Sequence, residues 1–238
     1  MRIYANGCSF TYGDELESPN TSAWPVLLAN QLGASVINDA VPGGTNPRTV
    51  YRTIKNLKED FDLYLIAWTA DTRFTVYKSD NNFEINFNPE LENNLYGQDD
   101  FYCAWGKTYY TTWYNQLYAF KLWLQQIIQL QAVLGNRQYV MINTMSNDVD
   151  KWTAPWSEFI PQVKSMINFD IMNDEQILAE YKEIQYYVEQ IDISKFYKWN
   201  QFAIQDLCNE YECGPGGHIL EHGHQQLANL INEHLCLK

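Results

Sequence analysis

The sequence predicts a three-layer α/β/α fold with a mostly parallel central sheet. Strand-like and helix-like stretches alternate along the chain, which is typical of α/β proteins. The strand-like stretches are short apolar runs suited to burial on both faces of a parallel sheet. With 238 residues, of which 46% are hydrophobic, the chain can bury one sizeable core. We therefore expect a single domain over residues 1–238.

Turn and cap signals separate the expected elements. The turn pair Asn6-Gly7 closes the first strand, Ser22 is the expected cap of the first helix, and Gly33 is expected to end that helix in a left-handed conformation. The expected strands are 1–5, 34–38, 62–68 and 138–143, and the expected helices are 22–33, 49–58, 109–134, 174–189, 195–208 and 222–235. Their alternation predicts a doubly wound sheet.

Two stretches interrupt this alternation. Residues 78–100 are polar and show no sustained period, so an excursion above the sheet is expected at about 74–106. Successive helical patterns without a strand between them predict a helical insertion at about 146–208. No internal repeat and no low-complexity linker divides the chain.

Charge and hydropathy exclude several classes of function. The chain has 16 Lys and Arg against 29 Asp and Glu, a net charge of −13, which repels nucleic acid and anionic membrane surfaces. No apolar run approaches the roughly 18 to 20 residues that span a bilayer, and the N-terminal residues do not resemble a signal peptide. We expect no nucleic-acid partner, no membrane span and a cytoplasmic location.

The five cysteines are scattered, and their number is odd. A chain of this size does not need disulfides to be stable, so reduced thiols are expected. No glycine-rich phosphate loop is present, and no cofactor is expected.

Ser9 is the first candidate for chemistry, because it lies just beyond the first predicted strand, at the edge where open α/β sheets bind ligands. A serine hydroxyl is a weak nucleophile unless a base takes its proton, so a histidine from elsewhere is required. The structural alternative is that Ser9 satisfies backbone groups in a turn or caps a helix.

Two further blocks adjoin predicted elements, one after the second strand and one before the last helix. Gly43 lies after the second strand, where a backbone N–H without a neighbouring Cβ can approach a developing oxyanion. The alternative there is a plain turn before a helix capped by Thr45 or Asn46. His218 precedes the last helix, and its ordinary pKa suits a proton acceptor at neutral pH, although surface and capping histidines are also common.

Together, Gly7 to Leu16, Asn38 to Gly43 and His218 with the following Gly223-His224 resemble, in this order, the motifs of the SGNH (GDSL-like) hydrolases. The resemblance covers nearly the whole chain, although each motif is short. It implies a flavodoxin-like α/β/α fold and a serine esterase or acylhydrolase. By position, Ser9 would be the nucleophile, His218 the base, and the N–H groups of Ser9 and Gly43 part of the oxyanion hole.

Two positions depart from the family pattern. The asparagine expected after the third strand is Ala70, so a side-chain oxyanion donor is missing, and Asn46 or Arg73 is the candidate substitute. The acid expected three residues before the histidine is Pro215. Glu212, an acid from another loop or a backbone carbonyl would then have to orient His218.

The segments Gly7-Cys8-Ser9 and Trp68-Thr69, with Arg73, look more like the divergent SGNH-like proteins often encoded by tailed phages than like secreted esterases. Two functions follow from the resemblance. One is hydrolysis of an ester, either an O-acyl group on a saccharide or a small ester. The other is a non-catalytic binding or virion-associated structural protein that keeps the fold.

A structural zinc site is a third possibility. Cys208, Cys213, His218 and His222 follow one another at spacings that zinc accepts. Cys208 also ends an apolar stretch, where a buried free cysteine behaves as a small hydrophobe. Zinc bound by His218 would prevent this histidine from acting as a base, so the zinc and hydrolase hypotheses exclude each other.

Overall fold

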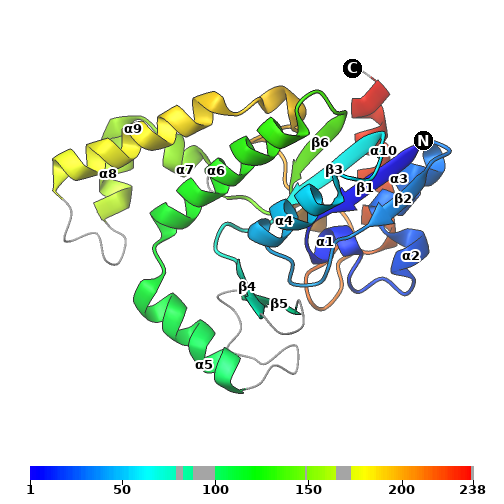
Figure 1. Cartoon of the computed structure of the whole chain (residues 1–238), viewed down its shortest axis with the longest axis horizontal. Helices are drawn as coiled ribbons and strands as arrows, with labels where there is room; N and C mark the ends of the chain where they lie inside the picture. Colours follow the sequence, from blue (N-terminus) through cyan, green and yellow to red (C-terminus); the bar gives the residue numbers. More distant parts are fainter. Residues whose placement is uncertain (79–82, 88–99, 148, 165–172, 237–238) are drawn as a thin grey trace.

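The computed structural model describes residues 1–78, 83–87, 100–147, 149–164 and 173–236 (Figure 1). Its centre is a four-stranded sheet in the order β2-β1-β3-β6, in which every neighbouring pair is parallel. The strands are β1 (Arg2–Asn6), β2 (Ser35–Asn38), β3 (Leu63–Trp68) and β6 (Tyr139–Asn143). Helices pack on both faces, which confirms the predicted α/β/α fold.

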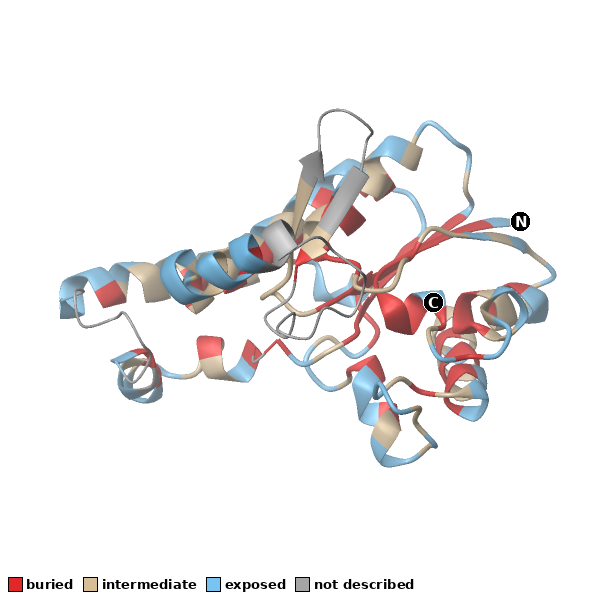
Figure 2. Ribbon diagram, turned by 90° about the horizontal axis from the view of Figure 1, so that it is seen from below, coloured by how far each residue is buried: buried red, intermediate tan, exposed pale blue. Residues whose placement is uncertain are grey.

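The side chains of β3 point alternately to the two faces of the sheet, as the period of a strand requires. Tyr64 and Ile66 belong to one apolar cluster, and Leu63 and Leu65 belong to the other. The first cluster includes α4 (Asn46–Asn56) and α6 (Gln116–Leu134), and the second includes α3 (Trp24–Gln31) and α10 (Glu221–Cys236). Figure 2 shows the buried strands between helices whose outer faces are exposed.

The remaining elements connect and extend these layers. Helices α1 and α2 are short and follow β1. The hairpin β4–β5 and helix α5 lie within the expected excursion, of which 79–82 and 88–99 are outside the described residues. The bounds are α1 (Ser9–Tyr12), α2 (Pro19–Ser22), β4 (Phe74–Lys78), β5 (Phe83–Phe87), α5 (Asp100–Thr108), α7 (Val149–Thr153), α8 (Trp156–Lys164) and α9 (Asp174–Gln190).

The helix expected over 195–208 is wrong. The chain has only short 3₁₀ turns at Ile193–Lys195 and Ile204–Asn209. Between them, the N–H of Tyr197 donates to the carbonyl of Met141 in β6 at 2.8 Å. This segment is extended despite its helical periodicity because β6 is the edge strand of the sheet, and the backbone groups on its outer side need hydrogen-bond partners.

The long helix expected over 109–134 is interrupted. A π-helical turn covers Tyr109–Trp113, and Tyr114 is extended. α6 then starts afresh at Gln116, because the side chain of Asn115 accepts the N–H of Tyr118 at 2.9 Å as an N-cap.

The cap predicted at Ser22 is also wrong. The N-cap of α3 is Ala23, and the N–H of Trp24 donates to Nδ1 of His224 in α10 at 3.1 Å. A side chain 200 residues away therefore satisfies an N-terminal group that a local serine was expected to satisfy. Gly33 has the predicted positive φ, at 61°.

Cys208 and Cys213 form a disulfide, so the expectation of reduced thiols is wrong for this pair. A turn in which the N–H of Tyr211 donates to the carbonyl of Leu207 brings the two cysteines together. Cys8 is a buried free thiol and Cys236 an exposed one. Separately, no helix in the described ranges is long and apolar enough to cross a membrane.

Candidate active site

Ser9 lies at the start of α1, at the carboxyl end of β1. The preceding Gly7 allows this tight turn, because a Cβ there would lie 2.6 Å from Oγ1 of Thr11 and 2.9 Å from Cβ of Ala67. Ser9 is 4% exposed. The strand-end position predicted from the sequence is thus the one that the serine occupies.

His218 lies beside this serine despite a separation of 209 residues. Its Nε2 is 2.8 Å from Oγ of Ser9, within hydrogen-bond distance. The ring of Phe10 packs against the imidazole, with centroids 4.8 Å apart. The structure therefore brings together the predicted nucleophile and the predicted base.

Glu15 supplies a carboxylate on the other side of the imidazole. Its Oε2 is 2.8 Å from Nδ1 of His218, and it also accepts the His218 N–H at 3.1 Å, while Oε1 accepts the N–H of Gly216 at 2.7 Å. Burial raises the pKa of the Glu15 carboxyl, but the hydrogen bonds from Gly216 and from the ring and N–H of His218 outweigh it and hold the pKa below its usual value. Glu15 is thus ionised at neutral pH.

A glycine-rich loop wraps this carboxylate. A Cβ on Gly214 would lie 2.6 Å from the carboxyl group of Glu15, and one on Gly216 would lie 2.9 Å from it. The loop is closed by the N–H of Gly214, which donates to the carbonyl of His218 at 2.8 Å. The glycines near the histidine thus make room for an acid from another part of the chain.

Sequence reasoning left the orienting acid open, and the structure places Glu15 there. Pro215 carries no acid, and Glu212 is exposed, with its backbone carbonyl accepting the N–H of Leu220. The available sequence signal was the pair Asp14-Glu15 directly after the serine turn. That signal does not choose between the two acids, since the choice depends on Glu15 adopting a φ of 68° and on contact with a loop 203 residues away.

The loop after β2 packs directly against the serine turn. A Cβ on Gly44 would lie 2.5 Å from the carbonyl oxygen of Gly7 and 3.1 Å from Cα of Cys8, while Gly43 has a φ of 69°. Neither the N–H of Ser9 nor that of Gly43 donates to an acceptor in the described part of the chain. Both backbone donors are therefore available to a ligand.

The two candidate substitutes for the missing asparagine differ. The amide of Asn46 is buried and holds the loop after β3, since Oδ1 accepts the N–H of Thr69 at 2.9 Å and Nδ2 donates to the carbonyls of Thr69 and Ala70 at 3.0 and 3.4 Å. Arg73 is half-buried, and its guanidinium donates to the carbonyl of Gly44 at 3.5 Å. Thr45 caps α4, as the structural alternative for this block predicted.

A buried polar network, which we call the Asp39 network, lies beneath these loops. The carboxylate of Asp39 accepts hydrogen bonds from Tyr4 Oη at 2.9 Å, from Asn56 Nδ2 at 3.2 Å, and from Arg52 Nε and NH2 at 3.1 and 2.7 Å. Arg48, whose side chain is 4% exposed, lies 3.8 Å from the carboxylate and donates to the Asp39 carbonyl at 2.9 Å. The network ties β1, the end of β2 and α4 together.

The structure does not gather the four proposed zinc ligands. Cys208 and Cys213 are bonded to each other, and His218 lies between Ser9 and Glu15. Within the described ranges, no group of three or more His, Cys, Asp or Glu side chains is placed to hold a metal ion. The zinc hypothesis for these residues is therefore wrong.

His224 is fully buried next to this site. Its Nδ1 accepts the N–H of Trp24, and burial, reinforced by the nearby His218, lowers its pKa to about 4. It is thus neutral at physiological pH.

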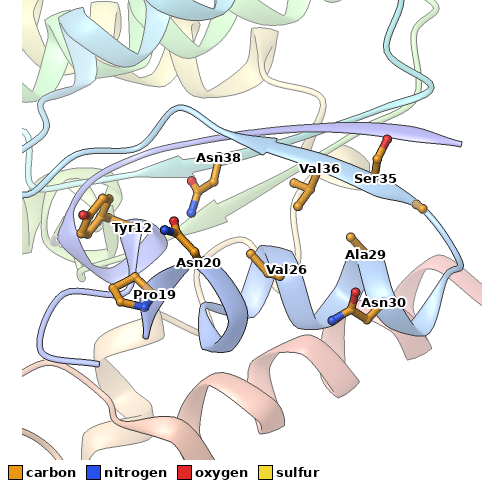
Figure 3. Close-up of a pocket in the computed structure, with 10 residues that line it drawn as sticks. Tyr12, Pro19, Asn20, Val26, Ala29, Asn30, Ser35, Val36 and Asn38 are labelled. Atoms are coloured by element: carbon orange, nitrogen blue, oxygen red, sulfur yellow. The ribbon is translucent and has the colours of Figure 1, made fainter. Parts of the chain in front are cut away.

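A cavity of about 340 Å³ lies between β2 and helices α2 and α3 (Figure 3). Tyr12, Asn20 and Asn38 gather at one end of it, and Asn38 also donates to the carbonyl of Thr11 at 2.8 Å. Tyr12 ends the helix that Ser9 begins, so the cavity adjoins the serine turn from outside the sheet.

The fold and this cluster define an α/β protein with a Ser–His–Glu arrangement at the carboxyl edge of a parallel sheet. The chain belongs to a family of unknown function, DUF6071, whose profile matches residues 13–154. This range contains Glu15 and the Asp39 carboxylate but neither Ser9 nor His218. No curated protein matches the chain at a significant level.

The solved structures that are similar to the chain include three lipolytic proteins. A lipase from a goat rumen metagenome is 10% identical, with a TM-score of 0.49 over 98% of this chain and 97% of that one. A lipase/acylhydrolase from Enterococcus faecalis is 14% identical, with a TM-score of 0.47 over 99% and 95%. A member of the lipolytic G-D-S-L family from Veillonella parvula is 12% identical, with a TM-score of 0.45 over 98% and 97%.

Proposed function

We propose that this chain is a serine hydrolase of SGNH type that cleaves a carboxylic ester, either a small ester or an O-acyl group on a saccharide. One observation carries the proposal. The imidazole of His218 lies between Oγ of Ser9 and the carboxylate of Glu15, at 2.8 Å from each. A nucleophile hydrogen-bonded to a base, which an acid orients in turn, is the arrangement that activates a serine.

Each group has a role that follows from its position. Ser9 Oγ attacks the ester carbonyl while its proton passes to Nε2 of His218, and the tetrahedral oxyanion accepts the N–H groups of Ser9 and Gly43. His218 then protonates the leaving alcohol, and a water molecule, deprotonated by the same nitrogen, releases the acid from Ser9. Glu15 holds the tautomer that has its proton on Nδ1 and stabilises the imidazolium.

Arg73 is the proposed additional donor near the oxyanion, since its guanidinium lies beside Gly44 and its charge complements an anion. The amide oxygen and the amide nitrogen of Asn46 both form hydrogen bonds with the loop after β3, so we assign Asn46 the role of holding that loop in place. The ester hydrolase proposed here needs no cofactor.

A non-catalytic binding or virion-associated protein is the second candidate, and Ala70 favours it. Loss of one side-chain oxyanion donor typically costs about 2.7 to 4 kcal/mol of transition-state stabilisation. The intact Ser9–His218–Glu15 geometry favours the hydrolase, because a binding protein does not require these three groups in contact.

Covalent labelling by a fluorophosphonate, followed by intact mass, separates the two candidates. The hydrolase predicts a single adduct on the wild-type protein and on the control Ser157→Ala, whose serine is exposed on α8, and no adduct on Ser9→Ala. An adduct that persists in Ser9→Ala would overturn the assignment. A folded wild-type protein without any adduct would favour the binding protein.

A further inference from the structure

A cavity of about 210 Å³ opens at the carboxyl end of β6, and we call it the β6 cavity. We propose that it binds one neutral sugar residue of the substrate, so that the ester cleaved at Ser9 is carried on a saccharide. The inference rests on the proposed hydrolase function for its link to catalysis. The sugar site itself is argued from the side chains that line the cavity.

The β6 cavity lies at the same edge of the sheet as Ser9. In the strand order β2-β1-β3-β6, the ends of β1 and β6 are two strand positions apart, which corresponds to about 10 Å. The loop after β3 separates them and is held by Asn147 of the cavity, which accepts the N–H of Asp71 and donates to the carbonyl of Thr69, both at 3.2 Å. A saccharide of a few residues can therefore reach from the cavity to the serine.

Asn143 provides the observation that points to a ligand. Its side chain lines the cavity and is nine-tenths or more buried, at 5% exposure. Nδ2 donates to the carbonyl of Trp199 at 2.7 Å, whereas the buried Oδ1 has no donor in the described part of the chain. Buried acceptors are nearly always paired. This one is shielded from solvent, so a hydroxyl in the cavity would pair with it after a small rotation of the Asn143 side chain.

The chemistry of the lining selects a neutral, hydroxyl-rich ligand. Asn200 and Gln201 line the cavity and are exposed, and Nδ2 of Asn200 donates to Oδ1 of Asp150. No Lys or Arg lines the cavity, so an anion would find no counter-charge. The carboxylate of Asp206 already accepts the N–H of Ala203 at 2.7 Å.

The apolar part of the lining suits the C–H face of a sugar ring. Phe202 and Trp199 both line the cavity, and the indole of Trp199 stacks parallel on that of Trp123, with centroids 5.6 Å apart. A pocket with a few placed polar groups on apolar walls is typical of small-ligand sites. By contrast, the cavity beside β2 (Figure 3) is lined by no buried polar side-chain atom that lacks a partner within the described ranges.

The test is a titration of the ¹⁵N-labelled full chain with the methyl glycosides of glucose, galactose and N-acetylglucosamine, each followed by NMR of the side-chain amides. We expect at least one glycoside to shift the Asn143 and Asn147 amide signals in a saturable way. Gln201→Ala is expected to weaken this binding about tenfold, as the loss of a hydrogen bond worth 1.4 kcal/mol would.

Gln205→Ala is the matched control, because Gln205 is exposed four residues further on and does not line the cavity. Affinity unchanged in this variant but reduced in Gln201→Ala supports the site. Absence of saturable shifts with all three glycosides, or equal affinity in both variants, would overturn it.

Fluorophosphonate labelling of the wild-type protein separates this inference from the function on which it rests. Labelling without glycoside binding removes the sugar site and leaves the hydrolase. Glycoside binding at Asn143 without labelling removes the hydrolase, and with it the claim that the sugar carries an ester cleaved at Ser9.

Discussion

Two polar clusters lie at the carboxyl edge of the sheet, and they differ in the groups that hold their carboxylates. The Asp39 carboxylate is 13% exposed and receives hydrogen bonds from three side chains, Tyr4, Arg52 and Asn56. In the Ser9 cluster, the Glu15 carboxylate, whose side chain is 21% exposed, receives hydrogen bonds from the ring of His218 and from the N–H groups of His218 and Gly216. The first carboxylate joins side chains of neighbouring elements, whereas the second fixes a loop whose histidine faces Ser9.

The clusters also differ in how far they reach along the chain. The Asp39 network joins residues 4 to 56, whose strands and helix pack as neighbouring elements. The Ser9 cluster joins the serine turn to a loop more than 200 residues away. Loss of one contact is therefore expected to affect stability in the first cluster and chemistry in the second.

The largest effect is expected for Glu15→Gln. The amide would present N–H donors to Nδ1 and favour the wrong tautomer of His218, so the rate of ester hydrolysis or fluorophosphonate labelling should fall by about 10² to 10⁴-fold. Labelling reactions that are stopped at a series of times, at several pH values, measure this rate. Glu17→Gln, two residues away and exposed, should keep the wild-type rate, and an equal loss in both variants would contradict an orienting role for Glu15.

Asp39→Asn is the matching change in the buried network. It removes the negative charge that lies 2.7 Å from Arg52 and 3.8 Å from the nearly buried Arg48, which is expected to lower the free energy of unfolding by about 3 to 5 kcal/mol. Urea denaturation measures this loss, and the exposed Asp60→Asn serves as the control. A loss below about 1 kcal/mol would show that the network is not the scaffold described here.

His224 sharpens the comparison, because it is buried near His218 yet has a structural role at the start of α3. Its pKa is about 4 in the folded chain and about 6.5 when unfolded. As the pH falls from 6.5 to 4, only the unfolded chain takes up this proton, so stability should fall by up to about 3 kcal/mol. His224→Gln keeps an acceptor for Trp24 and should remove this part of the pH dependence in urea denaturation. An unchanged slope would contradict a neutral buried His224.

The smallest effect is expected from opening the Cys208–Cys213 disulfide. Cys208 Sγ also lies 3.3 Å from the carbonyl of Gly217, and Cys213 pairs with Ile219, so the disulfide adjoins the loop that carries His218. Glu15 still anchors that loop in the double variant Cys208→Ser/Cys213→Ser. The rate of fluorophosphonate labelling should therefore fall by less than about tenfold. Cys236→Ser is the control, and a loss as large as that of Glu15→Gln would assign the anchoring to the disulfide instead.

Local patterns determined much of this protein. Short apolar runs and glycine stops predicted all four strands of the central sheet. Ser9 and Gly43 were singled out because they follow predicted strands, and His218 because it precedes the last predicted helix. These features follow from backbone periodicity and turn chemistry, which act over a few residues. The order of the three motifs predicted Ser9 and His218 as a nucleophile and base, and their side chains lie 2.8 Å apart in the structure.

Tertiary structure decided the features that depend on distant residues. Glu15 in place of an acid before His218, His224 as the cap of α3, and the extended Phe196–Tyr197 beside β6 each require a partner that lies far away in sequence. Local propensity at these positions is weak, and the free energy of satisfying a buried donor or an exposed strand edge exceeds it. Only the folded arrangement of the chain could therefore determine which acid faces the histidine.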